Sequence, residues 1–273
     1  MLKNKRLWAT VVLCLPAIAH IFPVLYMLSL SFKSAGEIFQ YPPKLIPTTF
    51  DLANYVKAFE SAPLARFLFN SLVVSLGVTL LQLVTSVLAA FALARLEFGG
   101  KKLLLGLVLA TMMVPGEVTI VPNYLTIAQF GWLDTYVSMI APFAAYGFGV
   151  FLLYQFFRTI PMELEEAVIV DGGSRFRFLW QFVLPLSAPA VVAFAVYAFV
   201  ATWNMYLWPL VVTQSTSMRT VQIGIGMFRS ENESSSWGVI MAATAILVAP
   251  SILLFVATQK QFVRGITMSG IKG

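Results

Sequence analysis

Charged residues are scarce in this chain of 273 residues, since aspartate, glutamate, lysine and arginine together make up only 11% of it. A soluble domain carries about a quarter charged residues, so this shortage argues against a water-soluble protein. Hydrophobic residues make up 59% of the chain and the mean hydropathy is +0.84. This composition is typical of a protein embedded in a membrane, and nucleic acid is not an obvious partner.

Cysteine and histidine are each present once, as Cys14 and His20. A single cysteine cannot form an internal disulfide. A membrane-embedded enzyme would need a nucleophile with its base or a metal cluster, and one residue of each kind leaves little for either. The chain also lacks a phosphate loop of the form GxxxxGK[ST], so it cannot be its own ATPase. We therefore expect no catalytic residue, no metal and no bound cofactor on this chain.

Six apolar stretches are long enough to cross the ~30 Å hydrocarbon core of a bilayer. They are separated by polar segments that are rich in turn-forming residues. We predict membrane-spanning helices over residues 7–32, 67–95, 103–125, 136–157, 186–212 and 237–258. The predicted fold class is an all-α membrane protein with six transmembrane helices, in which residues 1–273 form a single transmembrane domain.

Lysine and arginine are distributed unevenly between the two sides of these predicted spans. The side that holds the N-terminus carries twelve basic residues: Lys3, Lys5, Arg6, Arg95, Lys101, Lys102, Arg158, Arg175, Arg177, Lys260, Arg264 and Lys272. The opposite side carries six: Lys33, Lys44, Lys57, Arg66, Arg219 and Arg229. Basic residues accumulate on the cytoplasmic side of membrane proteins, so we expect both termini and the loop 158–185 to be cytoplasmic.

A polar segment of 25 residues, from Pro161 to Pro185, lies between the fourth and fifth predicted spans. Pro161 suits the first turn of a helix, and the glutamates that follow it lie near the positive end of the helix dipole. Gly172 and Gly173 are expected to end that helix. Ser174 can cap a second, aromatic-rich helix. The segment therefore predicts a helix–turn–helix that docks onto another protein.

The motif within this segment resembles the EAA loop of binding-protein-dependent ABC importer permeases. The match consists of Glu-Ala at 166–167, Asp-Gly at 171–172 and Leu-Pro at 184–185. Val168 stands where alanine is usual and Phe182 where isoleucine is usual, and both keep an apolar surface. The resemblance implies the type I ABC importer permease fold, with these ATPase-docking residues: Glu165, Glu166, Ala167, Asp171, Gly172, Leu184 and Pro185. An ordinary amphipathic loop with solvated glutamates is the alternative.

The C-terminal sequence QKQFVRGITMSGIKG is similar to the tail of the smaller permease of the maltose importer and its carbohydrate-importer relatives. In that family the tail enters the interface between the two ATPase subunits. Gly265, Gly270 and Gly273 would allow a close backbone approach there. A frayed, positively charged end of the chain is the alternative.

The resemblance also implies a set of partners in the inner membrane of a bacterial or archaeal cell. These are a dimer of ABC ATPases, a second homologous permease, an extracellular solute-binding protein, a small-molecule substrate and membrane lipid. ATP and Mg²⁺ would bind to the ATPase, whose closure would move the docking helices as rigid bodies and reorient the spans. The outer loop 213–236 is the expected contact for the binding protein, with a plain surface loop as the alternative.

Two features could line a substrate path. The first is the aromatic and amide cluster Trp203, Asn204 and Tyr206, because aromatic rings stack on sugars and an amide bonds hydroxyl groups. An interfacial aromatic belt or a contact with a partner helix would explain the same residues. The second is Glu117, which follows a Pro-Gly helix break. A carboxylate within a membrane is a functional candidate, although Glu117 could instead be solvated near the outer interface.

A neutral sugar or oligosaccharide is the predicted substrate, because no lysine or arginine lies in the interior of the predicted spans to bind an anion. An importer of sn-glycerol 3-phosphate is the alternative, since the family that the chain resembles includes such importers. A standalone secondary transporter is an alternative of another class. It would usually place paired ionisable groups at the bilayer midplane, where only Glu117 and His20 are candidates.

Overall fold

A computed structural model describes residues 2–230 and 237–270, with side chains for residues 12, 14–227 and 237–259. These residues form helices and connecting segments, without a β-strand. The chain divides into two compact units, Met1–Arg66 with Ile223–Pro250, and Phe67–Gln222 with Ser251–Gly273. Residues 231–236 of the predicted outer loop lie outside the described backbone. The side chains of the predicted ATPase-interface tail beyond Gln259 also lie outside the described residues.

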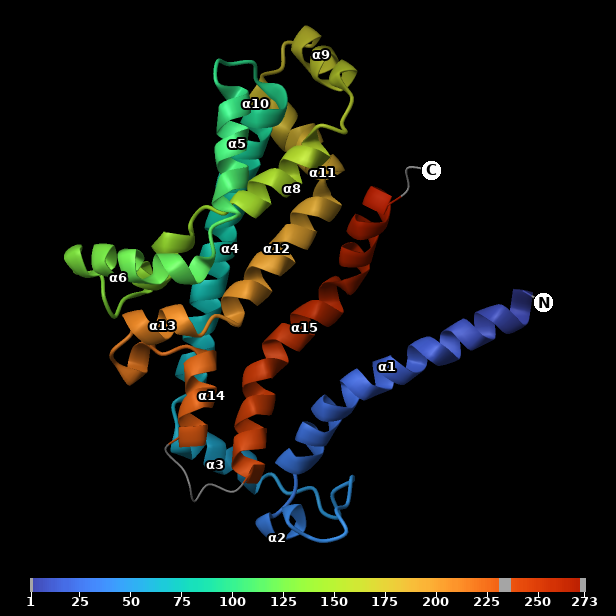
Figure 1. Cartoon of the computed structure of the whole chain (residues 1–273), viewed down its shortest axis with the longest axis vertical. Coiled ribbons are helices and arrows are strands. Elements are labelled where there is room, and N and C mark those ends of the chain that lie inside the picture. The colour runs from blue at the N-terminus through green and yellow to red at the C-terminus, as the bar shows by residue number, and fades with distance from the viewer. Residues whose placement is uncertain (1, 231–236, 271–273) are drawn as a thin grey trace. The chain divides into compact units, whose positions relative to one another are not determined.

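Three helices contain a stretch that is long and apolar enough to cross a membrane without a break. They are α1 (Leu2–Ser31), α4 (Leu64–Arg95) and α15 (Trp237–Gly270), shown in Figure 1. Three bent pairs also qualify: Lys101–Thr111 with Gly116–Gln129, Tyr136–Phe143 with Gly147–Phe157, and Arg175–Leu186 with Ala188–Trp203. Counting each bent pair as one span gives up to 6 candidate spans in the described part of the chain, as many as the sequence predicts.

The third and fifth predicted spans are not continuous helices. In the third, α5 (Lys101–Thr111) is followed by a 3-10 turn, η1 (Gly116–Thr119), and by α6 (Ile120–Gln129), with a bend of 92°. In the fifth, α12 (Ala188–Trp203) ends before α13 (Leu207–Val212) begins. Pro209 explains this second break, because its ring would clash with the carbonyl of residue 205 in a continuous helix.

One hydrophobic core joins the membrane helices of the second unit to the loop that the sequence predicts to dock. Its buried members come from α4, α8 (Gly147–Phe157), α9 (Met162–Val170), α10 (Arg175–Phe178), the π-helix η3 (Leu179–Val183) and α12. Phe157, Phe178 and Phe194 are completely buried in it. In Figure 1, α9 lies at the end of this unit where α4 ends and α5 begins. The loop is therefore an extension of the helix bundle rather than a separate appendage.

The break in the fourth span is stabilised by polar side chains of α4. Here α7 (Tyr136–Ile140) and a 3-10 turn, η2 (Ala141–Phe143), precede α8. Gln82 Nε2 donates a hydrogen bond of 3.0 Å to the carbonyl of Phe143, and Thr85 Oγ1 donates one of 2.9 Å to the carbonyl of Ala144. Backbone carbonyls freed within a membrane need such partners, because lipid provides none.

The polar connection that follows α1 belongs to the first unit and is folded there. It contains α2 (Ala35–Ile38), α3 (Ala53–Ser61) and the beginning of α15. Asn54 Nδ2 donates to the carbonyls of Ser31 (3.0 Å) and Lys33 (2.8 Å). Glu37 accepts a hydrogen bond of 2.7 Å from the backbone of Thr48. These polar contacts hold the connection against the end of α1.

Gly149 marks the closest approach of α8 to its neighbours. A Cβ atom there would lie 2.1 Å from Cζ of Phe194 and 2.6 Å from Oγ of Ser86, and both side chains are fully buried. We expect Gly149→Ala to lower the thermal unfolding midpoint of the detergent-solubilised protein, because overpacking a core costs about 1–3 kcal/mol.

The matched control for this prediction is Gly106→Ala in α5, where a Cβ would meet nothing within 4 Å. Because alanine is a better helix former than glycine by about 1 kcal/mol, this variant should unfold at the same temperature or higher. Equal unfolding temperatures for the two variants would contradict the close approach.

Candidate functional site

The loop 158–185 forms the predicted helix–turn–helix. Pro161 is the N-cap residue of α9, one position before the helix begins, and Glu163 and Glu165 lie in its first turn. Gly172 has a φ of +74°, a left-handed conformation that ends the helix and favours glycine. Ser174 caps α10 as predicted, since its Oγ accepts a hydrogen bond of 3.2 Å from the backbone of Arg177.

The outer face of the two helices exposes acidic and apolar side chains together. Of the predicted docking residues, Glu166, Ala167, Asp171, Gly172 and Pro185 are exposed and Leu184 is partly buried. Around them lie exposed large apolar residues: Met162, Ile169, Val170, Phe176 and Trp180. We call these exposed residues the docking surface. Exposed apolar patches of this kind mark contacts with another protein or with a membrane, and the acidic residues among them favour a protein.

Glu165 differs from its neighbour Glu166, because its side chain points into the protein. It is 4% exposed and shares the buried face of α9 with Val168, three residues further on. Glu165 Oε1 lies 3.5 Å from Nε of Arg175, and its Oε2 lies 4.0 Å from Nη1 of Arg95. Glu165 therefore holds the loop together from within and presents no side chain to a docking partner.

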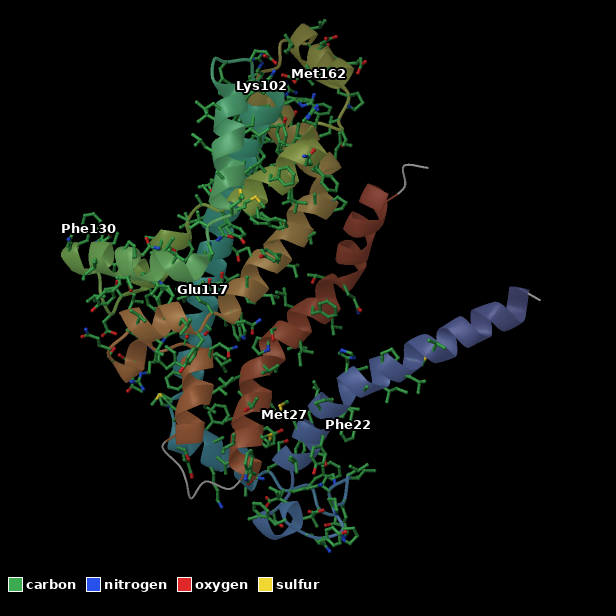
Figure 2. All side chains as sticks on the ribbon, viewed as in Figure 1. Phe22, Met27, Lys102, Glu117, Phe130 and Met162 are labelled. Carbon is green, nitrogen blue, oxygen red and sulfur yellow. The ribbon has the colours of Figure 1, made fainter. Side chains whose placement is uncertain are left out.

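Arg95 is a buried residue of this site that the sequence analysis counted only as a charge at the membrane boundary. It is the last residue of α4 and is 5% exposed. Its Nη2 donates to the backbone carbonyls of Phe157 (2.6 Å) and Ile160 (2.5 Å). Its Nη1 lies 2.8 Å from the sulfur of Met162, which Figure 2 labels at the start of α9. The only sequence signal was an arginine at the end of an apolar stretch.

Val168, which replaces the usual alanine of the motif, is matched by Gly173. A Cβ atom at position 173 would lie 2.6 Å from Cγ1 of Val168 and 2.8 Å from its carbonyl oxygen. The larger valine thus occupies the space that a side chain at 173 would need. These two residues form a complementary pair that closes the turn between α9 and α10.

The predicted substrate-path residues near the end of α12 have different environments. Trp203 is 2% exposed and stacks on Phe199 with ring centroids 5.6 Å apart, so its ring is not accessible to a substrate. Asn204 is exposed, and its amide donates to the carbonyl of Val200 (2.9 Å) and accepts from Nε2 of Gln222 (3.1 Å). Tyr206 is 42% exposed. Asn204 and Tyr206 keep surfaces that a substrate could contact.

Glu117 lies in η1, at the sharp bend between α5 and α6, where Figure 2 labels it. Its side chain is exposed. Within the described part of the chain, the Glu117 side chain forms no hydrogen bond or ion pair, either with Trp203, Asn204 and Tyr206 or with any other residue. No hydrogen bond or ion pair among the described side chains therefore links the two predicted features directly.

The first part of the predicted outer loop is fixed to the helix bundle rather than projecting freely. Asn70 Nδ2 donates to the carbonyls of Ser217 and Arg219, both at 2.8 Å. Asp134 Oδ1 accepts from the backbones of Gln214 (2.9 Å) and Ser215 (3.0 Å). Burial opposes ionisation of Asp134, but the hydrogen bonds from Ser215 and Gln214 outweigh it and lower its pKa. From residue 221 the loop is helical, as α14 (Val221–Ser230).

Comparison with known proteins connects this geometry to a transport family. The family described as "Binding-protein-dependent transport system inner membrane component" matches residues 82–268. The chain is 34% identical to the sn-glycerol-3-phosphate transport system permease protein UgpE of Agrobacterium fabrum, over 97% of this chain and 98% of that protein. It is 35% identical to the sulfoquinovosyl glycerol transport system permease protein SmoH of the same species, over 93% of this chain and 89% of that protein.

A solved structure has the same fold. It is a chain of a bacterial ABC transporter involved in the import of the acidic polysaccharide alginate, with a TM-score of 0.86 and 22% sequence identity. The alignment covers 95% of this chain and 97% of that chain. The predicted all-α fold of the type I ABC importer permeases is confirmed, and the single domain over residues 1–273 stays a prediction.

The complementary pair in the turn gives a prediction for the loop. We expect Gly173→Ala to lower the thermal unfolding midpoint, because the new methyl group overlaps Val168 at a cost of about 1–3 kcal/mol. Adding Val168→Ala removes the nearer contact, so the double variant should recover part of that loss. A double-mutant cycle that measures purely additive effects would contradict the direct contact.

Proposed function

This chain belongs to the family of binding-protein-dependent transport system inner membrane components, and from that membership we propose that it is the permease subunit of an ATP-driven ABC importer. In this proposal the docking surface of α9 and α10 binds a separate ATPase, which hydrolyses ATP with Mg²⁺. A second homologous permease completes the membrane pore. An extracellular solute-binding protein delivers the substrate.

The observation that carries the proposal is the docking surface. Its exposed side chains combine Glu166 and Asp171 with large apolar groups, while its inner side is part of the bundle core. A patch of this kind suits a protein partner, because apolar anchors supply most of the binding energy and charges set the orientation. The excess of basic residues on this side of the predicted spans supports a cytoplasmic loop and cytoplasmic termini. That is the compartment where ATP is available.

We propose a sugar or oligosaccharide as the substrate. The described lysines and arginines of the candidate spans lie near the span ends, and none lies deeper in a span where it could bind an anion; they are Arg66, Arg95, Lys101, Lys102, Arg175 and Arg177. Asn204, Tyr206 and Glu117 are exposed, and amide, phenol and carboxylate groups all bind hydroxyls. The second candidate is sn-glycerol 3-phosphate, which the similarity to UgpE favours. That anion would need cationic groups from the partner permease.

Reversing the charge at the docking surface tests the ATPase partnership. We expect Glu166→Lys to reduce the amount of ATPase that co-purifies with the membrane-inserted protein by roughly tenfold or more, because a charge at the centre of an interface can be worth over 1.4 kcal/mol. The matched control is Glu97→Lys, the same charge change on an exposed residue outside α9 and α10. Undiminished co-purification of the ATPase with Glu166→Lys would argue against this docking surface.

Uptake measurements test the substrate class. Cells that lack this subunit should lose uptake of a labelled neutral oligosaccharide and keep uptake of labelled glycerol 3-phosphate. In cells that carry Tyr206→Ala, we expect a higher KM for the sugar, because a stacking surface is lost. The control is Tyr41→Ala, a change at an exposed tyrosine in the first unit. Selective loss of glycerol 3-phosphate uptake would favour the second candidate.

A further inference from the structure

We infer that Arg95 is a positioning residue that makes the docking helices and the second membrane span move as one body. This inference rests on the proposed function, because it concerns how an ATPase-driven movement of α9 reaches the membrane. Arg95 is the last residue of α4; of the docking-surface residues it contacts only Met162, through the sulfur, and it forms no hydrogen bond or ion pair with the path residues. Its effect is therefore exerted through the groups that it holds.

The first of these groups is the backbone between α8 and α9. Nη2 of Arg95 bonds the carbonyl of Phe157, the last residue of α8, and that of Ile160, just before α9. The last carbonyls of a helix have no partner within the helix, so a side-chain donor fixes both the helix end and the chain that leaves it. The guanidinium is suited to this role, because its planar fork is always charged and presents several donors in fixed directions.

The second group is the buried carboxylate of α9. The side chains of Arg95 and Glu165 are 2% and 5% exposed, and their nearest charged atoms are 4.0 Å apart. Glu165 also lies 3.5 Å from Arg175 of α10, and the Arg95 guanidinium lies over the ring of Phe178, with its carbon 5.9 Å from the centroid. A chain of charges thus runs from the buried Arg95 of α4 through the buried Glu165 of α9 to the exposed Arg175 of α10.

Burial makes the Arg95–Glu165 part of this chain resistant to separation. Moving α9 away from α4 would leave the Arg95 guanidinium without its carboxylate in an apolar environment, which is far more costly than losing an exposed ion pair. Two carbonyls would lose their donors in the same movement. A displacement of the docking surface is therefore transmitted to α4, whose 32 residues span about 48 Å at 1.5 Å per residue.

A purely structural role for Arg95 would predict lower stability but normal coupling, so the tests measure coupling. The first test uses spin labels at Glu97→Cys, just beyond α4, and Glu163→Cys, in the first turn of α9, in a Cys14→Ser background whose transport has been verified. Both labelled residues are exposed. In the complete transporter, the distance between the labels should be the same without nucleotide and with a non-hydrolysable ATP analogue.

In the Arg95→Met protein, we expect the same pair of labels to give a broader distance distribution or one that differs between the two states. A label distance that shifts between the two states while Arg95 is present would overturn the inference. This measurement needs no change at Arg95, so it decides the question even if the methionine variant fails to insert.

The second test measures substrate transported per ATP hydrolysed in vesicles that contain the complete transporter. We expect Arg95→Met to lower this ratio by about tenfold, a size typical of coupling between sites, while the ATPase still co-purifies. Arg95→Lys should show an intermediate loss, since an ammonium keeps the charge but not the planar fork. The double variant Arg95→Met with Glu165→Met should insert, because no buried charge is left unpaired, and should still be uncoupled.

Arg158→Met is the matched control, since Arg158 is an exposed arginine in the same segment, and among the described residues its guanidinium interacts with Tyr154 alone. It should keep the normal ratio. A normal ratio in Arg95→Met or in the double variant would overturn the positioning role and leave the proposed function intact. Failure of the unaltered protein to bring down an ATPase would instead overturn the proposed function.

Discussion

Backbone carbonyls without helical partners need other donors, above all inside a membrane, and in this protein α4 supplies donors at three levels. Near its N-terminal end Asn70 bonds the carbonyls of Ser217 and Arg219. In its middle Gln82 and Thr85 bond the carbonyls at the break before α8. At its C-terminal end Arg95 bonds the carbonyls before α9. Each irregular segment of the second unit that these residues reach is thereby tied to one continuous helix.

This arrangement explains how a broken set of spans can still transmit a movement. A helix that is hydrogen-bonded to three irregular segments keeps them in fixed positions relative to one another, since packed cores are not continuously deformable. The docking surface can then expose large apolar side chains, because its own folding depends on the inner contacts of Glu165 and Val168 rather than on the partner. The inner face of these helices stabilises the fold of the loop, and their exposed face is left for the docking partner.

Much of this could be predicted from the sequence, because the relevant signals are local. Apolar stretches of sufficient length predicted the spans, and the cap at Ser174 predicted the start of α10. The sequence did not distinguish Glu165 from Glu166, because adjacent glutamates look alike until the packing of α9 decides which one is buried. It predicted a spanning helix over 186–212 without marking the break, although Pro209 was a local signal for one. The partners of Arg95 come from residues more than 60 positions away, and no local pattern reveals such contacts.

The candidate substrate path also shows what the sequence could not predict, because neighbouring residues there have different environments. The sequence grouped Trp203, Asn204 and Tyr206, but the ring of Trp203 is buried against Phe199 and serves the core. The Asn204 amide uses one donor on Val200 and accepts from Gln222, which leaves it a further N–H and a further lone pair for a hydroxyl group. The amide is held in place by two neighbours and still has hydrogen-bonding capacity, so it is oriented for a polar ligand. In the proposed importer, one oriented amide and an exposed phenol would form one wall of a path, and the second permease would have to supply the opposite wall.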